Sequence, residues 1–388
     1  MVLEKKLIDW VIKNKNLLFL IIVSLIGLLI RLSGLQFISK DMTKFLIPWF
    51  NEVASSGGLS ALNKQIGDYN LIYQTIISVM TYLKVDCVIS YKVISIFFDY
   101  ILAIVVAFLV CYLKDKEKSS MYFCLSYTLV LFFPTVIINS AFWGQCDSIY
   151  TAFIVLMILQ LLKEKYTSAF IFFGVSLAFK LQAIFVLPFI LCYYFYKRKF
   201  SIFNFIISFG VFWGSGIVAF LYGRDLLAPL KIYAFQSGEY KRMYMNFPSF
   251  WMLIGENYND FKISAILITF VLCGIALYLI LSGAFSPDTK EKILLLATAL
   301  IWTVILFLPS MHERYSYVLD IFLIVICFMD IKFLKYSVFS WMLSIFTYGN
   351  YLVKYRDWEI IYVMIYIILW GSFVYKVLNY QKNKTDFV

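Results

Sequence analysis

Long apolar runs separated by short polar segments dominate the chain. Stretches such as "LLFLIIVSLIGLLI" (17–30) and "YILAIVVAFLVCYL" (100–113) contain no charged side chain. They approach the roughly 20 consecutive apolar residues that a helix needs to cross a bilayer. The pattern therefore predicts an all-α fold, a polytopic bundle of membrane-spanning helices. No small-residue cleavage site follows the first run, so we interpret it as a retained helix rather than a signal peptide.

The composition supports this class of protein. Of the 388 residues, 62% are hydrophobic and only 15% are charged, whereas soluble domains carry about 25% charged residues. The net charge of +11 is interpreted as loops that face anionic membrane lipids, and nucleic acid is not expected as a partner. The seven cysteines show no metal-site spacing such as CxxC, and most lie inside apolar runs.

The positions of lysine and arginine decide which apolar stretches cross the membrane. If residues 69–86 spanned it, "KDKEK" (114–118), "KEK" (163–165) and "KRK" (197–199) would lie outside. That arrangement conflicts with the positive-inside rule. We therefore predict that residues 69–86 form a helix along the outer membrane surface. About twelve spans remain, with both termini in the cytoplasm: 16–35, 91–113, 119–139, 148–162, 167–179, 183–196, 201–223, 262–285, 291–308, 314–330, 333–350 and 358–378.

This topology has two long outer loops, residues 36–90 and 224–261, the first with amphipathic surface helices. The inner loops are short and carry little but lysine. No linker or shift in composition indicates a second domain, so residues 1–388 are interpreted as one integral membrane domain. Every segment dense in polar residues falls on the outer face. Any chemistry is therefore expected outside the membrane or at its outer leaflet.

Asp41 is the first candidate for chemistry. It lies in "SKDMTKFLIPWF", after the first span and before an amphipathic aromatic stretch. A carboxylate at the outer interface can act as a general base when a substrate hydroxyl comes within hydrogen-bonding distance. The alternative is structural, with Asp41 as the N-cap of the following helix. Asp68 and Asp147 are the other carboxylates considered for the base.

Basic residues form a second set of candidates. Lys180, in "VSLAFKLQAIFVLP", is an ionisable residue at membrane depth, which is costly and commonly functional. It either binds a phosphate as a point charge or extends its stem to the outer headgroups. His312, Glu313 and Arg314 follow one another in "MHERYSY", and the guanidinium fork suits phosphate oxygens. The alternative is a buried histidine beside an interfacial ion pair. Together, these charges on one membrane face indicate a site for an anionic, membrane-borne substrate.

The segment "NSAFWGQCDSIY" adds Trp143, Gln145 and Asp147 at the outer end of the third span. Tryptophan is common at membrane interfaces, and the glutamine and aspartate can hydrogen-bond sugar hydroxyls. Asp99 lies inside the second span, where it needs a partner or a proton. We interpret Asp99 as structural.

In this order, the segments resemble the GT-C superfamily of polyprenyl-phosphate-sugar-dependent glycosyltransferases. The nearest resemblance is to the dolichyl-phosphate-glucose transferases of asparagine-linked glycosylation and to bacterial relatives of the GPI-anchor mannosyltransferases. The match runs over most of the chain. "SKDMTKFLIPWF" stands where the family has an acidic residue in its first outer loop. "GDYNLIYQ", with Asp68 and Tyr69, is similar to its aspartate-tyrosine element. "NSAFWGQCDS", "LAFKLQAIFVLP" and "MHERYSY" are similar to its Trp-Gly-Gln-x-Asp, Phe-Lys-Gln and His-Glu-Arg elements.

The resemblance implies inverting transfer of a single hexose, such as glucose or mannose, from a polyprenyl-phosphate donor to a saccharide acceptor. Asp41 would deprotonate the acceptor hydroxyl, which attacks the anomeric carbon. Lys180, His312 and Arg314 would bind the donor phosphate, which gains charge as it leaves. The residues implied to contact substrate or to orient these groups are Trp143, Gln145, Asp147, Asp68, Tyr69 and Glu313. No cofactor is expected. A divalent metal is the alternative, but too few outer carboxylates lie near Asp41 to form a dedicated cage for one.

Departures from the eukaryotic pattern shift the expected acceptor. "FLIPWF" replaces a histidine and tryptophan, "GDYNLIYQ" lacks a doubled proline, and Trp-Gly-Gln replaces His-Phe-Gln. They favour a bacterial cytoplasmic membrane and a lipid-linked saccharide, teichoic acid or wall polysaccharide as acceptor. A polysaccharide polymerase is a related alternative.

Two alternatives come from other classes of protein. A transporter or flippase of a lipid-linked or anionic substrate would explain the intramembrane Lys180 and Asp99. It would also show broken spans in corresponding halves, and no such symmetry is evident. An O-acyltransferase built on His312 would need a funnel open to the cytoplasm, whereas the predicted topology places His312 outside.

Overall fold

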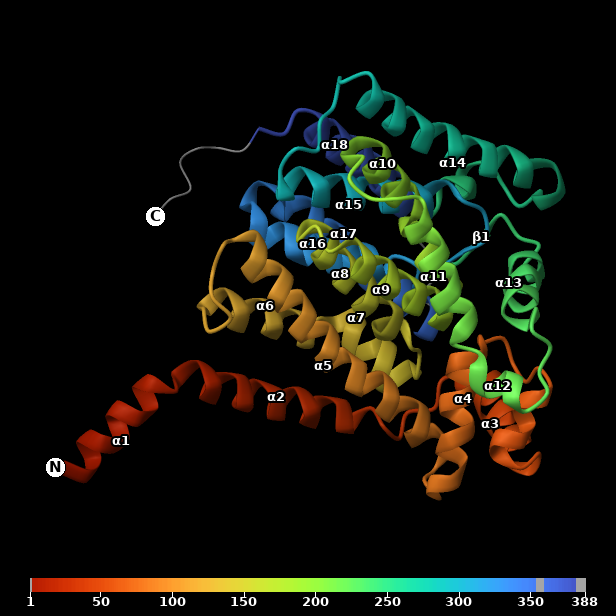
Figure 1. Ribbon diagram of the computed structural model, residues 1–388, viewed down its shortest axis with the longest axis horizontal. Coiled ribbons are helices and arrows are strands. Elements are labelled where there is room, and N and C mark those ends of the chain that lie inside the picture. Colours follow the sequence, from red (N-terminus) through yellow and green to blue (C-terminus); the bar gives the residue numbers. More distant parts are fainter. Residues whose placement is uncertain (1, 354–358, 382–388) are drawn as a thin grey trace. The chain divides into compact units, whose positions relative to one another are not determined.

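The computed structural model describes residues 2–353 and 359–381, and nearly all of its regular structure is helical (Figure 1). The all-α prediction is confirmed at this level. The exception is a parallel pair of two-residue strands, β1 (Tyr244–Met245) and β2 (Met311–His312). The backbone divides into two compact units, Met1–Leu181 with Phe205–Tyr233, and Gln182–Asn204 with Ala234–Val388.

Long apolar helices support an integral membrane protein. Four helices among the described residues have the length and composition to cross a membrane: α2 (Lys15–Ser33), α5 (Cys87–Leu113), α14 (Tyr258–Leu281) and α18 (Glu359–Leu378, apolar from Ile360). A fifth is possible if Met121–Leu131 and Pro134–Trp143, bent by 52°, form one span. Residue 358, where the last predicted span begins, lies outside the described residues.

The count of long apolar helices is smaller than the twelve predicted spans. Predicted spans 148–162, 167–179, 183–196 and 314–330 fall on helices of 10–17 residues. A helix rises about 1.5 Å per residue, so these helices are shorter than the roughly 30 Å hydrocarbon core. Predicted span 201–223 is divided between two short helices. Apolar runs indicated where helices form, but the breaks between them set the helix lengths.

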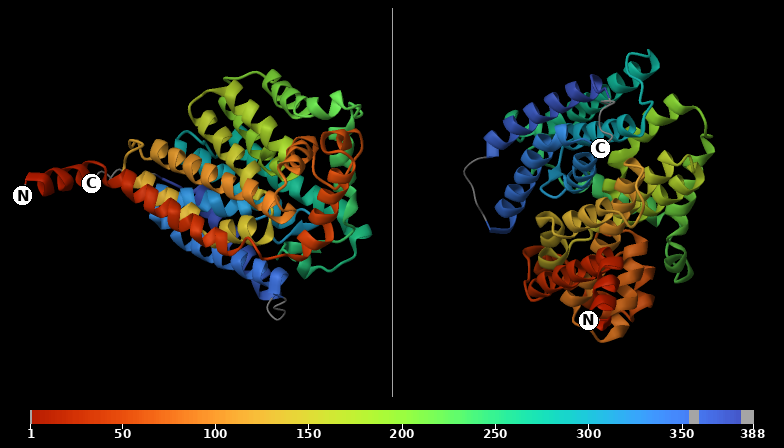
Figure 2. Two further views of the ribbon diagram at one scale, coloured as in Figure 1. Left: turned by 90° about the horizontal axis from the view of Figure 1, so that it is seen from below. Right: turned by 90° about the vertical axis from the view of Figure 1, so that its left-hand side faces the viewer.

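In the first unit, α5 is the central helix and packs against α6 and α8, while α8 packs against α9 (Figure 1). Helix α2 lies along α6 (Figure 2). Asp86 caps α5 by accepting hydrogen bonds from the backbone N–H groups of Val88 and Ile89. The remaining helices of this unit are α1 (Val2–Lys13), α6 (Met121–Leu131), α7 (Pro134–Ile137), the π-helix η4 (Ile138–Trp143), α8 (Asp147–Leu162), α9 (Tyr166–Phe179), α11 (Phe203–Gly214) and α12 (Ile217–Leu221).

Segment 36–90 folds as a string of short helices. They are the π-helix η1 (Met42–Leu46), α3 (Ile47–Ser55), the 3-10 helix η2 (Gly58–Asn63), α4 (Leu71–Met80) and the 3-10 helix η3 (Thr81–Leu83). Asn70 caps α4 by accepting a hydrogen bond from the N–H of Leu71. Helix α4 confirms a helix within residues 69–86 that is too short to span a membrane.

The core of the second unit is formed by α15 (Lys290–Phe307) and α16 (Tyr317–Met329), whose side chains are almost all buried. Helix α15 contacts α14, α16 and α18 (Figure 1). The other elements of the chain are η5 (Leu181–Val186), α10 (Leu187–Lys197), α13 (Ala228–Glu239), η6 (Phe250–Leu253), η7 (Ile331–Phe333) and α17 (Leu334–Val353).

Candidate functional site

The carboxylate of Asp41 is held by two side chains from a distant part of the sequence. Trp143 Nε1 donates a hydrogen bond to Asp41 Oδ2 at 2.8 Å, and Gln145 Nε2 donates to the same oxygen at 3.2 Å. Trp143 is fully buried and Gln145 is 4% exposed, whereas Asp41 is partly exposed. Asp41 precedes η1, but its side chain makes no capping hydrogen bond. Asp41 thus stands at the N-cap position without capping the helix through its side chain.

The turn at Gly144 places both donors on Asp41. Gly144 has φ +78°, and a Cβ at this position would clash with the methyl group of Met42. Only glycine adopts this conformation without strain. Ser39 joins the two segments, because its hydroxyl donates to the carbonyl of Trp143 at 3.0 Å and accepts from the N–H of Met42 at 3.1 Å.

Gln145 has a second feature that suits a binding site. Its Nε2 is used by Asp41, while its Oε1 is buried and has no hydrogen-bond partner among the described residues. Buried acceptors are almost always satisfied. A donor such as a substrate hydroxyl would complete the hydrogen bonding of this amide.

Lys92 binds the backbone between α2 and Asp41. The sequence analysis did not select it as a site residue. Its ammonium donates to the carbonyls of Gly34 at 2.7 Å, Leu35 at 3.2 Å and Phe37 at 2.5 Å. The side chain is fully buried, so these three acceptors satisfy its three N–H donors. These carbonyls follow the C-terminal end of α2, where a positive charge is favourable, and they lie in the chain shortly before Asp41. Its signal in the sequence was a lysine in an apolar run.

A buried ion pair joins α8 to the end of α9. Lys180 Nζ lies 2.5 Å from Asp147 Oδ1, and Asn139 Nδ2 donates to Asp147 Oδ2 at 2.8 Å. Asp147 is fully buried and Lys180 is 7% exposed. Lys180 has an extended backbone, with φ −154° and ψ 137°, directly after the last residue of α9. The Lys180 ammonium therefore points to Asp147, and not outward as it would to reach lipid headgroups. Both carboxylate oxygens of Asp147 have a partner.

Asp99 has the partner that its position required. Arg31 Nε donates to Asp99 Oδ2 at 2.8 Å, and both side chains are fully buried. The hydroxyl of Ser140 donates to the same oxygen at 2.5 Å. Because Ser140 belongs to η4, this pair also fixes the element that carries Trp143. The sequence indicated a partner but not which residue it would be.

Asp68 and Tyr69 lie in the turn before α4. Asp68 is partly exposed, and burial raises the pKa of its carboxyl above the ordinary value. The Tyr69 ring packs edge-on against Trp49, with ring centroids 6.1 Å apart. The carbonyl of Tyr69 accepts hydrogen bonds from Gln65 and Gln74. This turn is thus a defined part of segment 36–90.

In the second unit, Glu313 lies between its two basic neighbours. Arg314 Nη1 donates to Glu313 Oε1 at 3.2 Å, and His312 Nδ1 lies 3.9 Å from Oε2. Asn246 Nδ2 also donates to Oε2 at 3.3 Å. Glu313 is fully buried, whereas the His312 and Arg314 side chains are 11% and 16% exposed. This geometry suits a carboxylate that orients the Arg314 guanidinium, with the His312 ring beside it.

The predicted residues therefore form separate groups. Asp41, Trp143 and Gln145 form one group and Asp147 and Lys180 a second, both in the first unit, while His312, Glu313 and Arg314 belong to the second unit. Within residues 2–353 and 359–381, no three His, Cys, Asp or Glu side chains gather as metal ligands would.

No protein-family model matches the sequence, and comparison with curated proteins finds no match.

Proposed function

We propose that the protein is an inverting membrane glycosyltransferase. It moves a single hexose from a polyprenyl-phosphate donor to a hydroxyl of a lipid-linked saccharide or cell-envelope glycan. The reaction takes place at the outer face of a bacterial cytoplasmic membrane. The proposal includes a GT-C-like bundle of about twelve spans, with both termini in the cytoplasm and segment 36–90 outside.

The observation that carries the proposal is the Asp41 carboxylate held by Trp143 and Gln145. The two N–H donors fix the orientation of a partly exposed carboxylate, as a general base requires. The carboxylate takes the proton of the acceptor hydroxyl, and the hydroxyl oxygen attacks the anomeric carbon. The bond from that carbon to the phosphate oxygen breaks, and the polyprenyl phosphate leaves.

Basic residues take the donor phosphate in this proposal. Arg314 is paired with Glu313 and His312 lies close to the same carboxylate, and an arginine fork matches phosphate oxygens. Lys180 is the other basic residue proposed for the phosphate, and it would bind phosphate only by giving up its contact with Asp147. Charge that develops on the leaving phosphate strengthens its attraction to these groups and so lowers the barrier.

The test is an assay of purified protein in lipid nanodiscs with a panel of short-chain polyprenyl-phosphate sugars and lipid-linked saccharide acceptors. Release of polyprenyl phosphate is followed by mass spectrometry. Asp41→Asn keeps the shape of the side chain but removes the base, so turnover should fall about 10²–10⁴-fold. Donor binding, measured separately, should change little.

Glu52→Gln is the matched control. Glu52 is a carboxylate in α3 of the same segment, 49% exposed and paired with Lys64. The control should keep the wild-type rate. Near-normal turnover of Asp41→Asn would show that Asp41 is not the base, and Asp68 would be substituted next.

The second candidate function is a transporter or flippase of an anionic lipid-linked substrate. It is favoured by the buried ion pairs Arg31–Asp99 and Lys180–Asp147 in apolar helices, since intramembrane charges commonly line transport pathways. In this case the purified protein would move labelled lipid across vesicles without releasing polyprenyl phosphate. Asp41→Asn would then leave that movement unchanged.

A further inference from the structure

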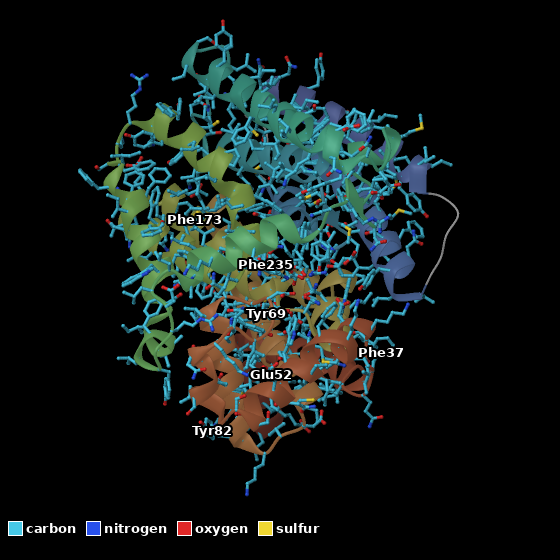
Figure 3. The ribbon with its side chains drawn as sticks, turned by 90° about the vertical axis from the view of Figure 1, so that its right-hand side faces the viewer. Phe37, Glu52, Tyr69, Tyr82, Phe173 and Phe235 are labelled. Atoms are coloured by element: carbon cyan, nitrogen blue, oxygen red, sulfur yellow. The ribbon has the colours of Figure 1, made fainter. Side chains whose placement is uncertain are left out.

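Segment 36–90, which contains Asp41, also holds a row of aromatic rings. The centroids of Phe45 and Trp49 are 5.6 Å apart, those of Trp49 and Tyr69 6.1 Å, and those of Tyr69 and Tyr73 4.4 Å. We call these four residues the aromatic row. Phe45, Trp49 and Tyr69 are partly exposed, and Tyr73 is the buried inner end. Figure 3 marks the position of Tyr69 in this segment.

The spacing of the sequence places the row in line with Asp41. Asp41, Phe45 and Trp49 follow one another at intervals of four residues through η1 and the continuous α3. Such an interval keeps side chains on one helix face. Phe45 therefore lies about one helical turn and Trp49 about two turns along the chain from Asp41. A short saccharide on the row therefore reaches Asp41 with one end.

Neighbouring residues of the same segment hold two members of the aromatic row in place. Gly67 has φ +70° and its backbone lies against the Trp49 ring, so that a Cβ there would clash with the indole. The carbonyl of Tyr69 accepts hydrogen bonds from Gln65 Nε2 at 3.3 Å and Gln74 Nε2 at 2.5 Å. Gly67 thus packs against the Trp49 ring, and the two glutamines hold the backbone from which the Tyr69 ring projects. Preorganisation of this kind lowers the entropic cost of binding.

We propose that the aromatic row binds pyranose rings of the acceptor saccharide. Aromatic side chains offer flat apolar faces to the C–H groups of a sugar ring, and the partly exposed Asp68 carboxylate beside Tyr69 accepts hydrogen bonds from its hydroxyls. A site for a hydrocarbon chain would be expected to have aliphatic side chains and no carboxylate next to it. The row binds the acceptor rather than the donor because it leads to the base. This part of the proposal rests on the proposed function.

The test uses protein labelled with 5-fluorotryptophan in nanodiscs, without glycosidic detergent. The chain has nine tryptophans, and Trp49→Phe identifies the Trp49 resonance in ¹⁹F NMR. Methyl glycosides of glucose, mannose, galactose and N-acetylglucosamine are titrated into the millimolar range. At least one should shift the Trp49 resonance, while Trp10, 54% exposed in α1, should not respond. Asp41→Asn should retain the shift, since it removes the base and not the row.

Two variants separate the row from general effects. Tyr69→Ala should weaken glycoside binding about tenfold, the loss expected for one ring contact of about 1.4 kcal/mol. Phe37→Leu is the control, because Phe37 is an aromatic residue of the same segment, 43% exposed, outside the row. It should bind as the wild type does.

The possible results distinguish this proposal from the proposed function. No Trp49 shift with any glycoside, or an equal shift of Trp10, overturns the aromatic row as a sugar site. If transfer depends on Asp41 while Trp49 stays silent, the row is wrong and the glycosyltransferase stands. If Trp49 responds but no donor is turned over, the sugar site stands and the glycosyltransferase fails.

Discussion

The buried pair Arg31–Asp99 yields the sharpest quantitative prediction. Arg31 donates to Asp99 Oδ2 at 2.8 Å, to the carbonyl of Gly27 at 3.1 Å and to that of Leu131 at 2.9 Å. Both charged side chains are fully buried. We consider the variants Arg31→Met, Asp99→Ala and their combination.

The two single variants should be the most harmful. Each leaves one charge buried without its counter-charge, which costs about 3–5 kcal/mol of the free energy of unfolding. The double variant leaves no such charge, so its loss should be smaller than the sum of the single losses. The expected coupling energy is about 1–3 kcal/mol. Ser140 shares Asp99 with Arg31, so Arg31→Met should also loosen η4 and slow any reaction at Asp41.

The free energy of unfolding can be measured by titrating sodium dodecyl sulfate into mixed micelles and following circular dichroism. Transfer activity is measured on the same preparations. Single variants that each cost less than ~1 kcal/mol, or a double variant whose loss equals their sum, would refute the reasoning. Either result would mean that the two charges are not mutually dependent.

Two further predictions concern the surroundings of Asp41. Lys92→Met should destabilise the protein by about 1–3 kcal/mol and slow transfer, because the carbonyls of Gly34, Leu35 and Phe37 lose a buried donor; the same unfolding titration measures the loss. Lys92→Arg, which keeps the charge, should recover part of both quantities, and equal effects of the two substitutions would contradict the role of the ammonium. For Asp68, burial raises the carboxyl pKa, so the folded state holds this proton more tightly than the unfolded state. The charged form is therefore penalised once the pH rises above the unfolded pKa. Asp68→Asn should stabilise the protein at pH 7, and the gain should vanish below about pH 4; melting curves across this range test it, and a gain that persists in acid would oppose it.

The helical class of the fold could be predicted because a membrane leaves the backbone few options. Apolar runs in a bilayer must satisfy their N–H and C=O groups internally, and a helix does so. Runs such as those in α2, α5 and α14 were therefore interpretable from the sequence. Helix lengths were not, because they depend on local breaks. Pro134, for example, ends the backbone ladder of α6 and bends the pair by 52°.

The candidate site residues could be chosen from the sequence one at a time, but the contacts between them could not. The residue type and the predicted outer position suggested a chemical role for each of Asp41, Trp143 and Gln145. The hydrogen bonds that join them connect residues 102 and 104 positions apart, and no local pattern encodes such contacts. The amide N–H of Gln145 binds Asp41, and its expected contact with sugar stays a prediction. The glycine between tryptophan and glutamine was a usable signal, since a conformation with positive φ redirects the chain.

The turn of residues 143–147 links the proposed base to the proposed phosphate lysine. In its first three residues, Trp143 and Gln145 donate hydrogen bonds to Asp41. At its end, Asp147 begins α8 and binds Lys180. Asn139 adds a contact on each side, since its carbonyl accepts from the N–H of Gln145 at 2.9 Å and its amide donates to Asp147. A shift of this turn therefore moves the partners of both Asp41 and Lys180. Binding of a phosphate at Lys180 would release Asp147 and act on Asp41 through three residues of backbone. The turn thus offers a direct physical connection between donor binding and the orientation of the base.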